Sequence, residues 1–446
     1  MIQIFKTKLG VVLAVGVMAA LVFSGVAGAR PSGVTVPGAP GGLSYVSGNK
    51  STTLNWTAPA SAGSSAIDGY EVEVSPACSL CTGVTAAGSA RTTLISGLTN
   101  YTQYKFRVRA HNASGWGAYS YQSGGNTPGD ARIYSAGWGL RYPLASATAT
   151  VGGNLYITNY GSDSVTKASL DGRTVSTITT SSAQFNGPSG IASDGANLWI
   201  TNTDGNSVTE LDSAGAVIRV VSGTPTGLNG PTAITVSNGT VYVVNSDGDS
   251  VTMLDATDGS VVGVVTGNGL RAPIAIAADS ITGNVWVVNY FGGRRAHFSQ
   301  SGLGSITILN ADGSRNSVVQ DSSLGSSAFN YPTSISIDGN NAWVAQDNEG
   351  NGGGSVLKLT LAGGLVSKIT DASFSDPQGI SSNGSLVLVS NFGGNSVSTL
   401  TASTGVVGTV LSGSRYGFNG PTGVFYDGSA FWVTNSLGNS ITKYLP

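Results

Sequence analysis

The chain has 446 residues, of which 65 are glycine and 15 are proline, and its formal net charge at pH 7 is −2. Charged residues make up only 10% and hydrophobic residues 40%, a composition that suits a folded core built from short strands and tight turns. Lysine and arginine are few and form no basic stripe, which argues against nucleic acid as a partner.

Residues 1–29 have the features of an export signal. Lys6 and Lys8 precede an apolar run at 9–27, and the run leads into the tripeptide AGA, a small-x-small cleavage site. We expect cleavage after this tripeptide, which leaves no membrane span and makes the protein secreted or bound at the cell surface. The alternative is an uncleaved anchor, because the run approaches the ~20 residues that cross a bilayer. Residues 30–36 are predicted to be a linker.

Residues 37–127 are predicted to form a β-sandwich. They contain short alternating segments, among them TTLNWTA, YEVEV and YKFRVRAHN, with Gly, Ser and Pro between them. The stretch GLTNYTQYKFRVRAHNASGWGAYS resembles the end of a fibronectin type III domain. The resemblance implies that Trp56 lies in the core and that the Tyr104 hydroxyl ties down the preceding loop. It also implies a spacer or an auxiliary binding module, with no catalytic residue.

The chain has two cysteines, Cys78 and Cys81, in a C-x-x-C pair. Such a pair is found in redox motifs and as half of a zinc site. Zinc needs two further ligands, and the chain has only His111 and His297 to offer as histidines. Because exported proteins commonly oxidise such pairs, we expect a small structural disulfide and no metal.

Residues 128–446 repeat one pattern. Segments such as LYITN, LWITN and FWVTN end in an Asn, replaced once by Gln, and successive copies lie 43 to 57 positions apart. A proline stands 14 or 16 positions before each of these strand-end residues, and a bulky wedge residue stands three positions before it. A period of roughly 40–45 with several strands is typical of a propeller blade, so we predict an all-β fold with a seven-bladed β-propeller. The strand-end residues are Asn159, Asn202, Asn245, Asn289, Gln346, Asn391 and Asn435; the inner-strand prolines are Pro143, Pro188, Pro231, Pro273, Pro332, Pro377 and Pro421; the wedge residues are Tyr156, Trp199, Tyr242, Trp286, Trp343, Leu388 and Trp432.

Each unit divides into four predicted strands. The inner strand follows the proline, the second ends at the strand-end residue, the third reads SVTxL, and the outer one is rich in valine. Pairs such as Asp194-Gly195, Asn238-Gly239 and Asp338-Gly339 predict two-residue hairpins with positive φ. The YITN, WITN and WVTN segments resemble the YVTN and NHL repeat propellers, a resemblance that implies a fold rather than a function.

The two ends of the repeat region are predicted to pair with each other. The last repeat stops at ITKYLP without an outer strand, and the segment ARIYSAGW at 131–138 has no inner strand of its own. We expect this segment to supply the missing strand, because joining the first and last blades removes two open sheet edges.

Loops after the strand-end residues and the corners before the prolines are predicted to share one side of the ring, which we call the loop face. The recurrent Asn side chains are interpreted as structural, since a side-chain amide at a strand end can hold the following turn. The alternative is a ring of amides that binds a sugar. The loop aspartates lack the dense spacing of a calcium loop. They are Asp163, Asp204, Asp247 and Asp249.

The repeat is interrupted after Asn289, where the short turn becomes NYFGGRRAHFSQSGLGS, and the turn after Gln346 is also lengthened. Aromatic, arginine and carboxylate side chains in such loops are usual materials of a polar ligand site. The alternative is a tolerated surface insertion. The candidate ligand-binding residues are Tyr290, Arg294, Arg295, His297, Asp347 and Glu349.

These features predict an exported, monomeric binding protein that holds an extracellular or cell-surface glycan or protein on its loop face, without a cofactor or catalytic residue. A similarity to streptogramin lyases implies an alternative, a propeller enzyme that uses histidines, carboxylates and a divalent metal. The repeat region has only His297, which cannot supply a two-histidine site. A third interpretation is an architectural component of the cell envelope.

Overall fold

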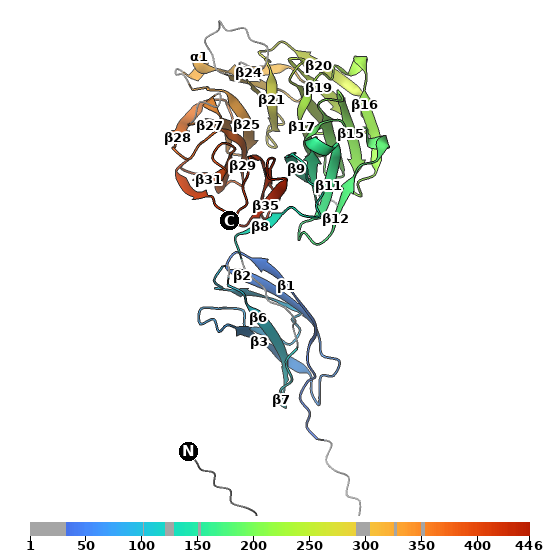
Figure 1. The fold of residues 1–446 in the computed structure, drawn as a ribbon, viewed down its shortest axis with the longest axis vertical. Coiled ribbons are helices and arrows are strands. Elements are labelled where there is room, and N and C mark those ends of the chain that lie inside the picture. The colour runs from blue at the N-terminus through green and yellow to red at the C-terminus, as the bar shows by residue number, and fades with distance from the viewer. Residues whose placement is uncertain are drawn as a thin grey trace, which may run out of the picture.

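The structure is a computed structural model, and it describes residues 33–100, 102–120, 129–149, 153–290, 304–324, 328–348 and 353–446. These residues form an N-terminal sandwich and a ring of sheets, and the sandwich extends from the outer rim of the ring (Figure 1). No helix in this part of the chain has the length and apolar character needed to cross a membrane. The arrangement confirms the predicted fold class, all-β with a sandwich followed by a propeller.

The N-terminal sandwich packs two sheets around one aromatic core. Trp56 and Tyr70 are buried there with ring centroids 5.3 Å apart, and Phe106 lies beside them. Alternate residues of β6 point inward because successive side chains of a strand face opposite sides. The sheets are β1 (Gly41–Gly48), β2 (Ser51–Thr57) and β5 (Thr92–Ser96) in one, and β4 (Thr85–Ala87), β3 (Ile67–Ser75), β6 (Lys105–Asn112) and β7 (Gly115–Trp116) in the other.

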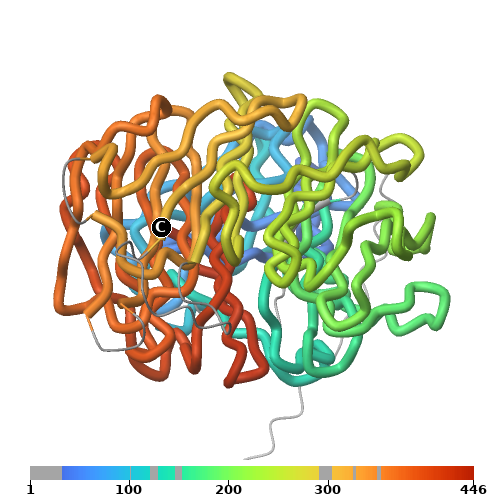
Figure 2. Tube along the Cα trace, turned by 90° about the horizontal axis from the view of Figure 1, so that it is seen from above, coloured from blue at the N-terminus to red at the C-terminus, as the bar shows by residue number. Residues whose placement is uncertain are grey.

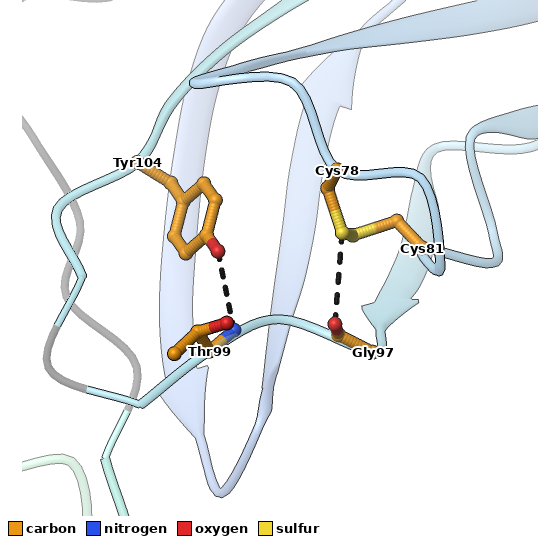
Figure 3. Close-up of a disulfide and its surroundings, with 5 residues drawn as sticks. All are labelled: Cys78, Cys81, Gly97, Thr99 and Tyr104. Atoms are coloured by element: carbon orange, nitrogen blue, oxygen red, sulfur yellow. Dashed lines mark hydrogen bonds between the residues drawn. A yellow bond between two sulfur atoms is a disulfide. The ribbon is translucent and has the colours of Figure 1, made fainter.

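Two local features of the sandwich lie close together in Figure 3. The backbone N–H of Thr99 donates a 3.2 Å hydrogen bond to the hydroxyl of Tyr104, which confirms that this tyrosine ties down the loop before it. Cys78 and Cys81 are joined in a disulfide, and the Cys78 sulfur lies 3.6 Å from the carbonyl oxygen of Gly97. Both features fix the loop that leads from β5 toward β6.

In the described residues the ring consists of seven four-stranded antiparallel sheets, numbered here first to seventh, and each inner strand contacts the inner strands on both sides. The short helices η1 (Tyr160–Ser162), η2 (Ser181–Ala183), η3 (Thr224–Thr226) and α1 (Asp321–Leu324) lie in loops. From inner to outer, the sheets are β9 (Pro143–Ala149), β10 (Asn154–Asn159), β11 (Ser164–Ser169), β12 (Val175–Ile178); β13 (Pro188–Ser193), β14 (Asn197–Asn202), β15 (Ser207–Asp212), β16 (Val217–Ser222); β17 (Pro231–Ser237), β18 (Thr240–Asn245), β19 (Ser250–Asp255), β20 (Val261–Thr266); β21 (Pro273–Ala278), β22 (Val285–Asn289), β23 (Ser305–Leu309), β24 (Arg315–Val319); β25 (Pro332–Ile337), β26 (Asn341–Gln346), β27 (Ser355–Thr360), β28 (Leu365–Thr370); β29 (Pro377–Ser382), β30 (Leu386–Asn391), β31 (Ser396–Thr401), β32 (Val407–Leu411); β33 (Pro421–Tyr426), β34 (Phe431–Asn435), β35 (Ser440–Tyr444), β8 (Ala131–Tyr134).

The sequence markers have direct structural counterparts. Every inner-strand proline pairs with the strand-end residue of its own sheet, as Pro231 does with Asn245. Every wedge residue is fully buried between two sheets. Trp199 packs on Ile234 and Val241 of the third sheet, and Trp432 packs on Leu155 of the first. These large side chains therefore fill the wedge-shaped gaps between neighbouring sheets.

The ring closes as the sequence predicts. β8 pairs antiparallel with β35, with Ile133 opposite Thr442, so the segment after the sandwich becomes the outer strand of the seventh sheet. Figure 2 shows the C-terminal strands, in red, beside the first sheet, in blue-green, and inner strands β33 and β9 are in contact. The same junction anchors the sandwich, because Arg173 donates to the carbonyl oxygen of Tyr45 at 3.1 Å.

The hairpins between inner and second strands differ from the predicted two-residue turns in most sheets. Asn238-Gly239 has positive φ at both residues, 49° and 76°, as predicted. At Asp338-Gly339 only the glycine has positive φ, and the Asp338 carboxylate accepts the N–H of Asn341 at 2.9 Å. The prediction was wrong there because an aspartate side chain takes the N–H that a tight turn gives to a carbonyl. Asp194-Gly195, Asn383-Gly384 and Asp427-Gly428 show the same side-chain arrangement.

Candidate functional site

The strand-end asparagines are structural, and the structure rules them out as a sugar-binding ring. All six are fully buried. The Asn202 amide donates hydrogen bonds to the hydroxyls of Ser207 at 3.0 Å and Thr209 at 2.9 Å. The Thr209 hydroxyl in turn donates a 2.7 Å hydrogen bond to the carbonyl oxygen of Ala183. Each amide thus ties the third strand to the corner loop. Because these side chains are fully buried, a ligand on the loop face does not reach them.

A second set of hydrogen bonds joins neighbouring sheets across the loop face. The residue four positions after a strand-end residue accepts the N–H of the residue before the next inner-strand proline. Asp163 accepts from Gly187 at 2.8 Å, and Asp249 accepts from Ala272 at 2.6 Å. These two aspartates therefore join neighbouring sheets, and this structural role explains their presence in the loops without a calcium ion. Asn206, Asn395 and Asn439 make the same bond to Gly230, Gly420 and Tyr142.

The residue before each inner-strand proline, here called the corner position, lies in the left-handed region in all seven sheets. Its φ ranges from 41° to 62°. Glycine adopts this conformation at no steric cost, whereas a residue with a Cβ is destabilised by roughly 1–2 kcal/mol. Three sheets have glycine there and four have a larger residue. The corner positions are Tyr142, Gly187, Gly230, Ala272, Tyr331, Asp376 and Gly420.

Corner glycines coincide with a large side chain at the turn position, which lies two residues after the strand-end residue. A side chain at Gly230 would place its Cβ 2.7 Å from the Asp247 carboxylate, and one at Gly420 would meet Leu437 at 2.6 Å. The relation reverses in the first sheet, where the turn position is Gly161 and its Cβ would meet Tyr142 at 3.2 Å. In these sheets one location on the loop face is filled from one of two loops, whereas the fifth sheet has a side chain at both positions, Tyr331 and Asn348.

The loop face also carries two pairs of tyrosines. The rings of Tyr142 and Tyr160 have centroids 6.3 Å apart, and the Tyr160 hydroxyl donates to the Asp204 carboxylate at 2.9 Å. The rings of Tyr290 and Tyr331 have centroids 5.4 Å apart. Each pair therefore combines a corner tyrosine with the residue that follows a strand-end residue.

Of the predicted ligand-binding residues, the structure places two. Tyr290 packs against Tyr331, and the N–H of Asp347 donates to the carbonyl oxygen of Tyr331 at 3.0 Å, so Tyr331 connects them. Arg294, Arg295, His297 and Glu349 lie outside the described residues. The sequence analysis did not single out Tyr142, Tyr160 or Tyr331. Tyr142 and Tyr331 are recognisable in the sequence as a tyrosine directly before a proline where three other copies read NGP, whereas Tyr160 has no such signal.

Glu210, which is buried, and Lys443, which is half-buried, lie in the third strands of their sheets, away from the loop face. Burial raises the pKa of Glu210, although Arg219, 2.7 Å away, opposes this shift. Burial lowers the pKa of Lys443, whose ammonium lies over the Trp432 ring and donates to the carbonyl oxygen of Leu170 at 2.9 Å. In the described part of the chain, no three His, Cys, Asp or Glu side chains are grouped so as to hold a metal.

Comparison with known proteins supports both parts of the fold. Residues 38–125 match the fibronectin type III domain. The ring is similar to virginiamycin B lyase from Staphylococcus aureus, at 15% identity and a TM-score of 0.55, covering 71% of this chain and 99% of that one.

Two further solved structures are similar to the ring. A streptogramin B lyase is 16% identical with a TM-score of 0.54, covering 70% of this chain and 96% of that one. The Cps50 (Swd1) β-propeller domain of Myceliophteria thermophila is 11% identical with a TM-score of 0.54, covering 71% and 99%. At these identities the likeness shows the fold alone.

Proposed function

We propose that the protein is an exported binding protein whose loop face holds a ligand outside the cell. The supporting observation is that the residues repeated in every copy are buried, whereas residues that differ between copies lie on the loop face. The strand-end amides are buried in hydrogen bonds, and the wedge residues are buried between sheets. Aromatic and acidic residues that vary between copies gather instead on the loop face, as Tyr142 and Asp204 do.

The proposal includes the organisation predicted from the sequence. Residues 1–29 serve as a cleaved signal, 30–36 as a linker, 37–127 as a fibronectin type III-like spacer or auxiliary binder, and 128–446 as a YVTN/NHL-like propeller. The mature protein is a secreted or surface-bound monomer. The sandwich meets the ring at its rim, through Arg173 and Tyr45, and so leaves the loop face accessible.

Capture of the purified chain by cell-surface material tests this function. The variant Arg294→Ala, Arg295→Ala, His297→Ala, with Tyr290→Ser added, should reduce capture if the loop face binds. Val262→Ser, an exposed change on outer strand β20, is the matched control and should leave capture unchanged. Equal capture of the wild type and the loop-face variant, or loss in the Val262 variant, would contradict the proposal.

The alternative function, a lyase, is supported by the similarity in fold between this chain and two lyases. The two lyases are 15% and 16% identical to this chain, too little to transfer an activity. Binding on the loop face is therefore the function that the arrangement of side chains supports best.

A further inference from the structure

The corner tyrosines are not required by the fold. Gly187, Gly230 and Gly420 occupy the same position in three other sheets with φ between 58° and 62°, and the ring continues through them in the same way. Tyr142 and Tyr331 adopt φ of 46° and 53°, a conformation that disfavours bulky side chains. Sequences retain such residues where the side chain has a use that offsets the cost.

Both corner tyrosines are accessible to some extent, Tyr142 as an exposed side chain and Tyr331 as a half-buried one. Tyr142 is 39% exposed, and its backbone N–H is fixed by Asn439 at 2.7 Å. Its partner Tyr160 is held by a hydrogen bond to Asp204. Tyr331 is held through its carbonyl oxygen by the N–H of Asp347. Both tyrosine pairs therefore have fixed backbones and a carboxylate-bearing residue beside them.

The chemistry of the surrounding loops indicates a ligand rich in hydroxyl groups and without negative charge. Among the described residues of the seven loops that follow the strand-end residues, there are five aspartates and no lysine or arginine, while the corners add Arg141 and Arg271, so carboxylates remain in excess over these two guanidinium groups. Carboxylates accept hydrogen bonds from hydroxyls, whereas they repel a polyanion. An aromatic ring offers its apolar face to the C–H groups of a sugar ring, and a phenol adds a polar edge.

A protein partner fits this face less well. The centre of a protein interface is a continuous apolar surface. On the described part of the loop face, the strongly exposed large apolar side chains are Tyr142 and Leu437, whereas the other exposed valines and isoleucines are mostly on outer strands such as β16 and β20. Separate tyrosines in polar surroundings are suited to successive sugar units.

We propose that the loop face binds an uncharged polysaccharide chain, with Tyr142–Tyr160 and Tyr290–Tyr331 as two sugar-stacking subsites. The inference rests on the proposed function and names its ligand class. The subsites belong to the first sheet and to the junction of the fourth and fifth sheets, so a chain that occupies both crosses the mouth of the ring.

Affinity electrophoresis of the purified full chain tests the proposal, with hydroxyethylcellulose, a soluble β-1,3-glucan or a galactomannan in the gel, and polygalacturonate as the anionic probe. We expect retardation by at least one uncharged polymer and none by polygalacturonate. Tyr142→Gly and Tyr331→Gly should each weaken binding about ten-fold, the effect of losing one aromatic contact of roughly 1.4 kcal/mol. Because glycine is the residue of other corners, both variants should keep the melting temperature of the wild type.

Trp116→Ser is the matched control, since Trp116 is also 39% exposed but belongs to the N-terminal sandwich. Full retardation of both tyrosine variants, retardation by polygalacturonate alone, or no retardation by any uncharged polymer overturns the proposal. Cell-surface capture separates its failure from that of the proposed function. Capture that depends on Tyr290 and the arginines but not on Tyr142 or Tyr331 leaves loop-face binding intact and removes the polysaccharide subsites. Loss of binding in the Trp116 variant removes both.

Discussion

The backbone N–H of Tyr142 donates a 2.7 Å hydrogen bond to the side-chain oxygen of Asn439, 297 positions later in the chain. Neighbouring sheets elsewhere are joined by the same bond, as between Gly420 and Asn395 at 2.8 Å. The first and last sheets therefore meet through the ordinary inter-sheet contact. The strand pairing of β8 with β35 is the additional element that only the closure has.

Deletion of residues 131–134 should destabilise the whole ring. The deletion exposes the edge of β35 and removes backbone hydrogen bonds, each of which contributes about 1 kcal/mol. We expect the melting temperature of the ring, followed by circular dichroism, to fall by several degrees. Val264→Ser on exposed strand β20 is the control and should change stability by less than about 0.5 kcal/mol. An unchanged melting temperature after the deletion would show that β8 does not hold the ring closed.

The sequence predicts the features that each copy must repeat. Strand-end residues, inner-strand prolines and wedge residues are needed in every sheet, so their periodic spacing reveals them, and the missing outer strand reveals the closure. The corner tyrosines were missed because their role depends on a relation between two loops. The residue at the corner can be interpreted only together with the residue at the turn position, as with Tyr142 and Gly161 or Gly230 and Asp247. The hairpins were predicted incorrectly because the Asp338 side chain replaces a backbone acceptor.

The hydroxyl in the WVTN segment should contribute measurably to stability. Thr434 is fully buried, accepts the N–H of Gly423 at 2.8 Å and donates to the carbonyl oxygen of Leu144 at 3.0 Å, across the closure. Thr434→Val leaves both buried groups without this partner and should lower the free energy of unfolding by about 1–3 kcal/mol. Thr434→Ser keeps the hydroxyl and should cost less, since Ser390 makes the equivalent bonds in the sixth sheet. Denaturant unfolding measures both; a loss in Thr434→Val no larger than that in Thr434→Ser would show that the buried hydroxyl does not make the expected contribution.

Exchange of side chains between corner and turn positions should be tolerated only as a pair. Gly230→Asp alone forces its Cβ against the Asp247 carboxylate, 2.7 Å away, and places two like charges together. We expect it to lose about 2 kcal/mol or more, from strain and repulsion. Adding Asp247→Gly reproduces the arrangement of Asp376 and Gly393 in the sixth sheet and keeps the net charge.

A double-mutant cycle on thermal unfolding measures this coupling, which should be about 1–3 kcal/mol in favour of the pair. Asp247→Gly alone is the reference for the loss of the aspartate. Additive effects of the two changes would show that side chains at the corner and turn positions do not compete for one location, which would contradict the relation between Gly230 and Asp247.

Acid should weaken the ring through two aspartates that hold buried tryptophans. Asp338 accepts the indole N–H of Trp343 at 2.8 Å, and Asp427 accepts that of Trp432 at 2.7 Å. Burial acts to raise the pKa of both carboxyls, but their hydrogen bonds outweigh it and hold each pKa below its ordinary value. A folded-state pKa below the unfolded value stabilises the fold above about pH 4, and this contribution is lost as the pH falls through the folded value.

The melting temperature should therefore be nearly constant from about pH 7 to 5 and fall below about pH 4. The double variant Asp338→Asn, Asp427→Asn should melt lower at neutral pH and show a shallower acid fall, because an amide does not titrate. Trp343→Phe removes one of the donors that lowers the Asp338 pKa, so its acid fall should be smaller and should end at a higher pH. Parallel acid curves for the wild type and the double variant would assign the acid sensitivity to other carboxylates.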